Sequence, residues 1–275
     1  MDTILQAIVM GIVQGLTEFL PISSSGHLVL APYLLGWDDE LITSLSFSVV
    51  LHLGTLVALL AYFWRDWVRL VPAGLAAVRD RSFGDDPDRR LAWVILATMP
   101  PAIVAGLLLN DVLEEQVRQP LLVALMLVIG AAILWTADRL GRRAAGIERI
   151  GFGGALFVGC AQALALVPGI SRSGISISAG LALGLTREAA ARFSFLMAAP
   201  IIAAAGAWET RQLLVGETGV SPDPGVLAAG FAASALAGFA AIAVLLRYLR
   251  GHSMTVFVVY RLVLAALVVV FFLAA

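Results

Sequence analysis

A short polar segment interrupts the apolar N-terminal region, and its residue types could support acid–base and nucleophilic chemistry. The segment is QGLTEFLPISSSGH at 14–27, and it contains Glu18, Ser24 and His27. A histidine can accept a proton or attack phosphorus, and a serine becomes a nucleophile when a base is near. Because ionisable side chains at membrane depth are costly, a carboxylate among so many apolar residues indicates a functional site. Ser24 and His27 are alternative nucleophiles.

A second polar segment, PGISRSG at 168–174, supplies a permanent cation, Arg172. A guanidinium with neighbouring hydroxyl groups and free backbone N–H groups at a helix start is a good set for binding phosphate. A structural ion pair between Arg172 and a buried carboxylate is the alternative. The phosphate ligands that the two segments predict are Ser23, Ser25, Ser171, Arg172, Ser173 and Gly174.

Gln14 and Glu18 are candidate ligands for a metal ion. They are four residues apart, so their side chains share one face of a helix. A carboxylate and an amide oxygen suit a hard divalent cation, Mg²⁺ or Ca²⁺, held jointly with phosphate oxygens. We expect such a cation as the cofactor. An ion pair between Glu18 and Arg172 without metal is the alternative, and the two arrangements can coexist.

The composition indicates what kind of protein positions these residues. The chain is 60% hydrophobic and only 13% charged, whereas soluble domains carry about 25% charged residues. Segments of about 20 mostly apolar residues can span a membrane. Six segments qualify, so we predict an all-α polytopic membrane protein with six transmembrane helices. These segments are roughly 42–64, 92–110, 120–137, 193–210, 226–246 and 254–275.

The two polar segments interrupt the apolar regions 1–36 and 151–185 midway. Each region therefore offers two arms that are too short to span a membrane, which favours a re-entrant helix–loop–helix hairpin. We expect Pro21 and Gly26 to set the break in the first hairpin, through a missing N–H and a permissive backbone.

The two interrupted regions are also copies of each other. A shift of 148 residues (162 − 14) aligns QGLTEFLPISSSGHLVLAPYLLG with QALALVPGISRSGISISAGLALG. Each copy has one hairpin and three spans, and an odd number of spans inserts the copies in opposite directions. We therefore predict one membrane domain, 1–275, built as an inverted-topology repeat, in which broken helices meet near the bilayer midplane. The first repeat is 1–137, the second is 151–275, and 138–150 is a cytoplasmic linker.

The arginines predict the orientation. They cluster in 65–91 and 138–149 and flank the later spans. With six spans these clusters all lie on one side, which the positive-inside rule identifies as cytoplasmic. Both termini then lie on the opposite side.

Three further residues could carry chemistry. His52 lies in an apolar span, and we favour a structural role for it. Arg261 lies several residues inside the last span, where it either snorkels to the cytoplasmic surface or braces a broken helix. Cys160 is the only cysteine, which excludes an intrachain disulfide and a cysteine metal site.

The two motifs resemble those of the undecaprenyl pyrophosphate phosphatases, the bacitracin-resistance family. QGLTEFLPISSSGH is similar to the family's (E/Q)xxxE motif with its serines and histidine, and PGISRSG to its PGxSRSG signature. The resemblance implies that Gln14 and Glu18 serve the metal role, that Ser24 and His27 are catalytic, and that Arg172 binds phosphate. Many members carry a glutamate at the position of Gln14, so a lower metal affinity is implied here.

The resemblance also implies an activity and a location. The expected protein is an enzyme of the bacterial inner membrane, with its site open to the periplasm. It hydrolyses undecaprenyl diphosphate to the monophosphate and inorganic phosphate, which recycles the lipid carrier for peptidoglycan and confers bacitracin resistance. The expected partners are this polyprenyl diphosphate lipid and membrane lipids, with no nucleic acid, and a homodimer is a candidate assembly.

A transporter is the alternative function, because inverted repeats with paired hairpins are a transporter architecture. A polyprenyl-phosphate transporter or flippase would need Arg172 but no nucleophile. The SSSGH segment with Glu18 supplies reactive groups that a pure carrier would not need. We therefore expect a phosphatase.

Overall fold

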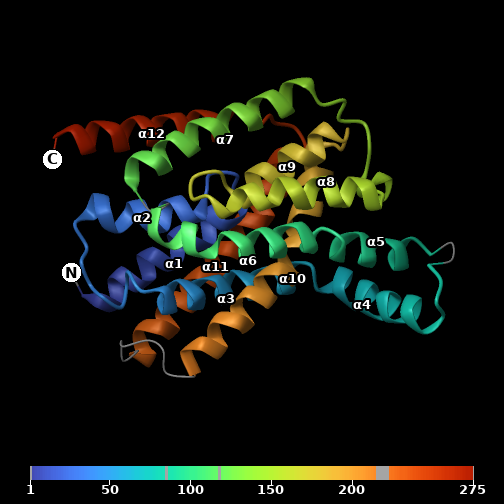
Figure 1. Ribbon diagram of the computed structural model, residues 1–275, viewed down its shortest axis with the longest axis horizontal. Helices are drawn as coiled ribbons and strands as arrows, with labels where there is room; N and C mark the ends of the chain where they lie inside the picture. Colours follow the sequence, from blue (N-terminus) through green and yellow to red (C-terminus); the bar gives the residue numbers. More distant parts are fainter. Residues whose placement is uncertain (1, 84–85, 117–118, 215–222, 275) are drawn as a thin grey trace.

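The computed structural model describes residues 2–83, 86–116, 119–214 and 223–274, which form helices joined by short loops (Figure 1). Within these ranges the isolated bridge between Ala145 and Leu185 is the only strand-like pairing. The helices are α1 (Thr3–Phe19), α2 (Ser24–Leu35), α3 (Leu45–Tyr62), α4 (Trp64–Arg79), α5 (Pro87–Leu96), α6 (Met99–Gln116), α7 (Pro120–Leu140), η1 (Ile147–Arg149), α8 (Phe152–Ala163), η2 (Leu164–Leu166), α9 (Arg172–Ala182), α10 (Arg187–Leu214), α11 (Pro224–Leu249) and α12 (Thr255–Ala274).

Six helical segments are long and apolar enough to cross a membrane, which confirms the prediction of an all-α polytopic membrane protein. One of them consists of two helices, α5 and the start of α6, because Pro100 and Pro101 lack the N–H groups that would extend α5. The six segments are Leu45–Tyr62, Pro87–Leu108, Pro120–Leu140, Arg187–Trp208, Pro224–Leu249 and Thr255–Ala274.

The two interrupted regions form helix pairs of the kind expected for re-entrant hairpins. α1 and α2 make up the first pair, and α8 with η2 and α9 make up the second. The apolar helices Thr3–Phe19 and Phe152–Leu166 are both shorter than the six spanning segments. α7 continues to Leu140, past residue 137, where the sequence analysis ends this span.

The break in each pair is set by a serine. Ser23 and Ser171 have φ values of 77° and 75°, in the left-handed region that residues with a side chain rarely adopt. Each serine then caps the helix that follows, since Ser23 Oγ accepts from the Gly26 N–H at 3.3 Å and Ser171 Oγ accepts from the Gly174 N–H at 3.1 Å. The two helix starts therefore share one capping geometry at the repeat spacing of 148 residues (171 − 23). The residues before them differ, since Gly169 has a φ of 103° and the matching position is Pro21.

The prediction that Gly26 sets the break is wrong. Gly26 lies inside the first turn of α2 with ordinary helical geometry. Its missing side chain serves packing, because an added Cβ would lie 3.2 Å from Val123 and 3.3 Å from Ser23 Oγ. The break before α2 depends on the capping hydroxyl of Ser23 and not on a flexible glycine.

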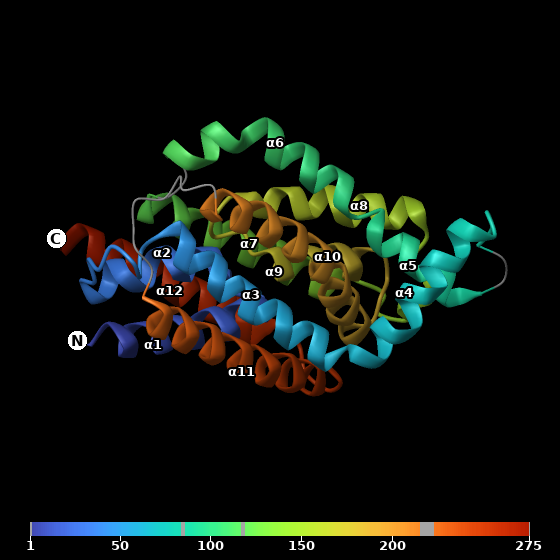
Figure 2. The same ribbon diagram turned by 90° about the horizontal axis from the view of Figure 1, so that it is seen from below.

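Close contacts between helices hold the α1–α2 pair in place. α1 packs along α11, and α11 packs along α3 (Figure 2). An added Cβ at Gly11 would lie 2.4 Å from the Gly230 carbonyl oxygen, and one at Gly15 would lie 2.6 Å from the Ser234 carbonyl oxygen. Small residues therefore allow the α1 and α11 backbones to touch. This contact fixes the end of α1, where Glu18 lies.

The two termini lie at the same end of the molecule, and α4 and α5 lie at the other end (Figures 1 and 2).

The loops before α2 and α9 meet in the interior, where the Gly169 N–H donates to Ser23 Oγ at 3.1 Å and Ser173 Oγ donates to the Leu20 carbonyl at 3.0 Å. Each loop is thus bound directly to the other.

Candidate active site

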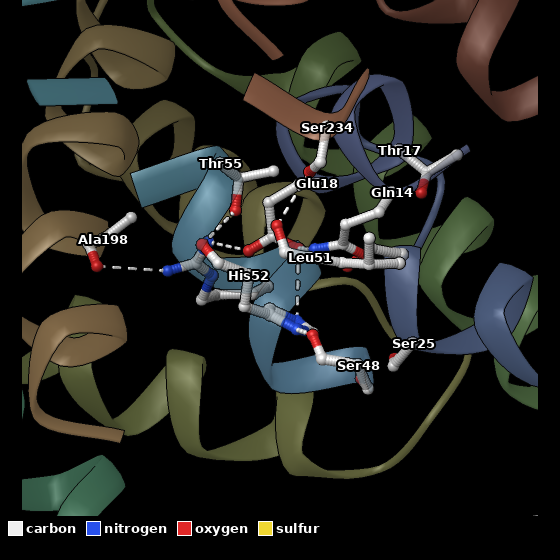
Figure 3. A network of polar contacts seen from close by, with 12 residues as sticks. Gln14, Thr17, Glu18, Ser25, Ser48, Leu51, His52, Thr55, Ala198 and Ser234 are labelled. Carbon is white, nitrogen blue, oxygen red and sulfur yellow. Dashed lines mark hydrogen bonds and ion pairs between the residues drawn. The ribbon is translucent and has the colours of Figure 1, made fainter. Parts of the chain in front are cut away.

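Glu18 is the centre of the polar cluster in the interior. It lies in the last turn of α1 and is buried. Its Oε1 accepts from the Arg172 guanidinium, and its Oε2 accepts from Ser24 Oγ at 2.5 Å and from Gln14 Nε2 at 3.1 Å. Figure 3 shows Gln14 and Glu18 side by side within this network. Three of the residues singled out in the sequence, Gln14, Ser24 and Arg172, therefore meet at the carboxylate of the fourth, Glu18.

Ser24 and Arg172 are equivalent in position. Each is the first residue of its helix, α2 or α9, directly after the serine with positive φ. The N-terminus of a helix carries a partial positive charge and free N–H groups. Two helix starts and the Arg172 guanidinium therefore face a single carboxylate, Glu18. This excess of positive charge favours an anionic ligand such as a phosphate group.

The other predicted phosphate ligands differ in what their hydroxyls already bind. Ser23, Ser171 and Ser173 are almost fully buried and take part in the hydrogen bonds that shape and join the loops. Ser25 is only partly buried and lines a cavity. Arg172 keeps a fifth of its side chain exposed. Arg172 and Ser25 are therefore the accessible members of the set.

His27 lies apart from the Glu18 cluster. Its Nδ1 is 2.7 Å from the Ser23 carbonyl oxygen, and its Nε2 is 2.8 Å from the Tyr260 hydroxyl. Because a carbonyl can only accept, Nδ1 carries the proton and Nε2 accepts from Tyr260. Both ring nitrogens are thus engaged, in a buried side chain. The structure does not bring His27 into hydrogen-bond contact with Ser24 or Glu18.

His52 occupies the place beside Glu18 instead. It comes from α3, and its Nε2 lies 3.8 Å from Glu18 Oε2. Its Nδ1 is 2.7 Å from the Ser48 carbonyl oxygen, so Nδ1 is the protonated nitrogen and Nε2 carries a free lone pair. A third of the side chain is exposed, and Figure 3 shows its ring between Ser48 and Glu18. Sequence reasoning did not foresee this contact, since nothing in the apolar segment around His52 marks it.

A cavity of about 320 Å³ opens beside the cluster. One side is polar and is formed by Ser25, Ser48 and His52, and the rest is mostly apolar. It reaches Thr43 and Ser44 in the connection between α2 and α3. A molecule with a polar head and an apolar tail fits such a lining. The main apolar residues are Met10, Leu28, Val29, Ile42, Leu45, Phe47 and Leu51.

The fit of a divalent cation depends on Gln14 and Glu18. Gln14 Oε1 is buried and has no hydrogen-bond partner among the described residues, so one oxygen beside the carboxylate is available. The described part of the chain contains no group of three or more His, Cys, Asp or Glu side chains that could hold a metal ion. The protein can therefore offer the two oxygen ligands Gln14 Oε1 and Glu18, and a bound phosphate would have to supply others.

Comparison with known proteins adds independent information. The family model described as "Bacitracin resistance protein BacA" matches residues 7–267. A curated "Undecaprenyl-diphosphatase" of Moorella thermoacetica is 46% identical over 98% of both chains. Proteins of the same name from Desulforudis audaxviator and Gemmatimonas aurantiaca are 45% and 48% identical, over 96% and 97% of each pair of chains. The chain is thus similar to these relatives over almost its whole length.

Proposed function

The chain belongs to the family of the bacitracin resistance protein BacA, and we infer from this membership that it is an undecaprenyl-diphosphatase. It is a multi-pass membrane enzyme that hydrolyses undecaprenyl diphosphate to undecaprenyl phosphate and inorganic phosphate. One observation carries the inference: Ser24 and Arg172, each at a helix start, converge on Glu18. This arrangement provides a nucleophile, a base and an anion site in a chain that matches diphosphatases over its length.

The proposed first step uses Ser24 as the nucleophile. As its oxygen bonds to the terminal phosphorus, the proton passes to Glu18 Oε2, which already accepts a hydrogen bond from this hydroxyl at 2.5 Å. The bond between that phosphorus and the bridging oxygen breaks, and undecaprenyl phosphate leaves. Arg172 and the two helix starts stabilise the negative charge on the transferring group. His27 is the weaker candidate nucleophile, because both of its ring nitrogens are engaged.

In the second step water hydrolyses the phosphoserine and releases inorganic phosphate. Glu18 already holds the proton of Ser24, so His52 Nε2, which lies 3.8 Å from Glu18 Oε2, takes the proton of the attacking water. Glu18 returns its proton to Ser24 Oγ as the bond between that oxygen and phosphorus breaks. His52 also lines the cavity beside the cluster, and we propose this cavity as the route by which water and substrate approach Ser24. We assign His52 to this step.

A divalent cation, Mg²⁺ or Ca²⁺, is part of the proposal. Gln14 Oε1 and Glu18 would hold it jointly with diphosphate oxygens. When bound, it would neutralise charge on the diphosphate. Arg172 already occupies Glu18 Oε1, so the cation is expected to bind with the substrate and not before it.

The cavity gives the proposed orientation of the lipid. Its polar side at Ser25 and His52 suits the diphosphate, and its apolar residues suit the first part of the prenyl chain. It reaches the connection between α2 and α3, and the termini lie at the end opposite the arginine-rich α4–α5 region (Figure 2). We therefore place the site opening and both termini on the periplasmic side of the inner membrane. The transporter alternative is not favoured, because a carrier has no use for the Ser24–Glu18 pair.

Phosphate release from a polyprenyl diphosphate by the purified protein in detergent tests the function. We expect turnover with Mg²⁺ or Ca²⁺ and a large loss after chelation with EDTA. Movement of the lipid across liposomes without phosphate release would instead support the transporter.

Two of the three histidines provide a matched pair. We expect His52→Leu to lower turnover by about 10²-fold or more, since a positioned proton-transfer group typically contributes 10²–10⁴-fold. His252→Leu should leave turnover unchanged, because His252 is exposed and its ring contacts the nearby Tyr248, with Nδ1 3.0 Å from the Tyr248 carbonyl oxygen. The measurement is the phosphate-release rate per folded molecule. Equal rates for these two variants would remove His52 from the mechanism.

A further inference from the structure

Arg261 in α12 binds both loops of the active site. It is completely buried, at 0% exposure. Its Nε donates to the Pro21 carbonyl at 2.6 Å, and its Nη1 donates to the Ile170 carbonyl at 3.1 Å. Pro21 belongs to the loop before α2 and Ile170 to the loop before α9. One side chain of the last span therefore connects the two breaks, which excludes the option that it snorkels to the surface.

Two glycines make room for this guanidinium. An added Cβ at Gly130 would lie 2.1 Å from Nη1, and one at Gly174 would lie 2.3 Å from Nη2. Gly130 belongs to α7, which packs against α12 (Figure 1). The guanidinium is thus confined between α7 and the start of α9, and any larger residue at either position would displace it.

Arg261 has no counter-ion in the described part of the chain, where the ion pairs involve other residues. Its Nη2 also lacks a hydrogen-bond partner there. A buried arginine at membrane depth is costly, and such residues mark functional positions. A residue that served packing alone would not need this charge, whereas two backbone carbonyls from separate loops need the paired donors of a guanidinium.

We propose that Arg261 is a positioning residue of the phosphatase: it holds the Pro21 and Ile170 carbonyls and thereby fixes Ser24 relative to Arg172. Pro21 comes shortly before Ser24, and Ile170 comes shortly before Arg172. The inference rests on the proposed function, because it concerns the geometry of that reaction. A displacement of about 1 Å between reacting groups can cost about 10²-fold in rate.

The test compares Arg261→Met and Arg261→Lys with the wild type in phosphate release, with folded protein quantified by size-exclusion chromatography and thermal melting. We expect kcat per folded molecule to fall by about 10²-fold while KM changes far less, because Arg172 still binds phosphate. Lysine keeps the charge but cannot present two donors to two carbonyls, so it should not restore kcat. Restoration of kcat by lysine would show that only the charge matters and would overturn the proposal that Arg261 positions the two loops.

Gly130→Ala provides a second probe that leaves Arg261 itself intact. We expect a kcat loss similar to that of Arg261→Met and little additional loss in the double variant, since both changes release the same contact. Gly153→Ala is the matched control, because among the described residues nothing beyond its own helix turn lies within 4 Å of its added Cβ. Wild-type kcat in folded Arg261→Met and Gly130→Ala would refute the proposal that Arg261 positions the two loops. Absence of phosphate release from wild type and Gly153→Ala alike would instead count against the proposed function.

Discussion

Glu18→Gln is expected to reduce the turnover of phosphate release by about 10³- to 10⁴-fold, at the upper end of what a general base contributes. The amide keeps the size of the side chain but cannot accept the Ser24 proton. It also leaves Arg172 without its anionic partner, which favours substrate binding, but it weakens one of the two proposed cation ligands, which opposes substrate binding. We therefore expect the main effect on kcat. The measurement is kcat and KM for a polyprenyl diphosphate in detergent.

Glu188→Gln is the matched control for this change. Glu188 also pairs with an arginine, Arg250, but this pair lies at the exposed surface. Exposed ion pairs contribute little to stability, so the control should retain wild-type turnover and folding. Near-normal kcat for Glu18→Gln would show that the carboxylate is not the base for Ser24.

Arg172→Met should have an effect of similar size. An arginine that stabilises a transferring phosphoryl group is worth about 10³- to 10⁵-fold in kcat. We expect a loss in this range together with a higher KM, because the guanidinium contacts the anion before and during the transfer. Arg172→Lys should recover only part of the activity, since lysine lacks the fork of donors that now reaches both Glu18 and the Ala198 carbonyl.

The arginine of the surface pair again provides the control. Arg250→Met removes an equal charge from the exposed pair with Glu188, and Arg250 does not line the cavity, so kcat and KM should remain unchanged. If Arg172→Met raised KM alone, Arg172 would bind the substrate without stabilising the transition state. Unaltered kcat and KM would exclude Arg172 from the site.

Much of this architecture could be predicted from the sequence because the signals are local. The apolar segments have the length of a membrane span, and Gln14 and Glu18 share a helix face through their spacing in one helix. The break positions also follow from short polar segments. The repeat relates Ser24 to Arg172, and both occupy the same position at the start of a helix.

The contacts that could not be predicted join residues far apart in the chain. His52 reaches Glu18 from α3, and Arg261 reaches Pro21 from α12. These contacts depend on how each apolar helix is rotated about its axis, and close packing at small residues such as Gly11 and Gly130 determines this rotation. Hydrophobic periodicity gives no such information for a helix that is apolar on all sides.

The identity of the phosphorylated residue tests the central claim most directly. The enzyme would be mixed with a substrate labelled in its terminal phosphate, quenched within milliseconds, and analysed by mass spectrometry for the labelled residue. We predict an acid-stable phosphoserine at Ser24, which accumulates in His52→Leu and is absent from Ser24→Ala. An acid-labile phosphate on His27 would contradict the account.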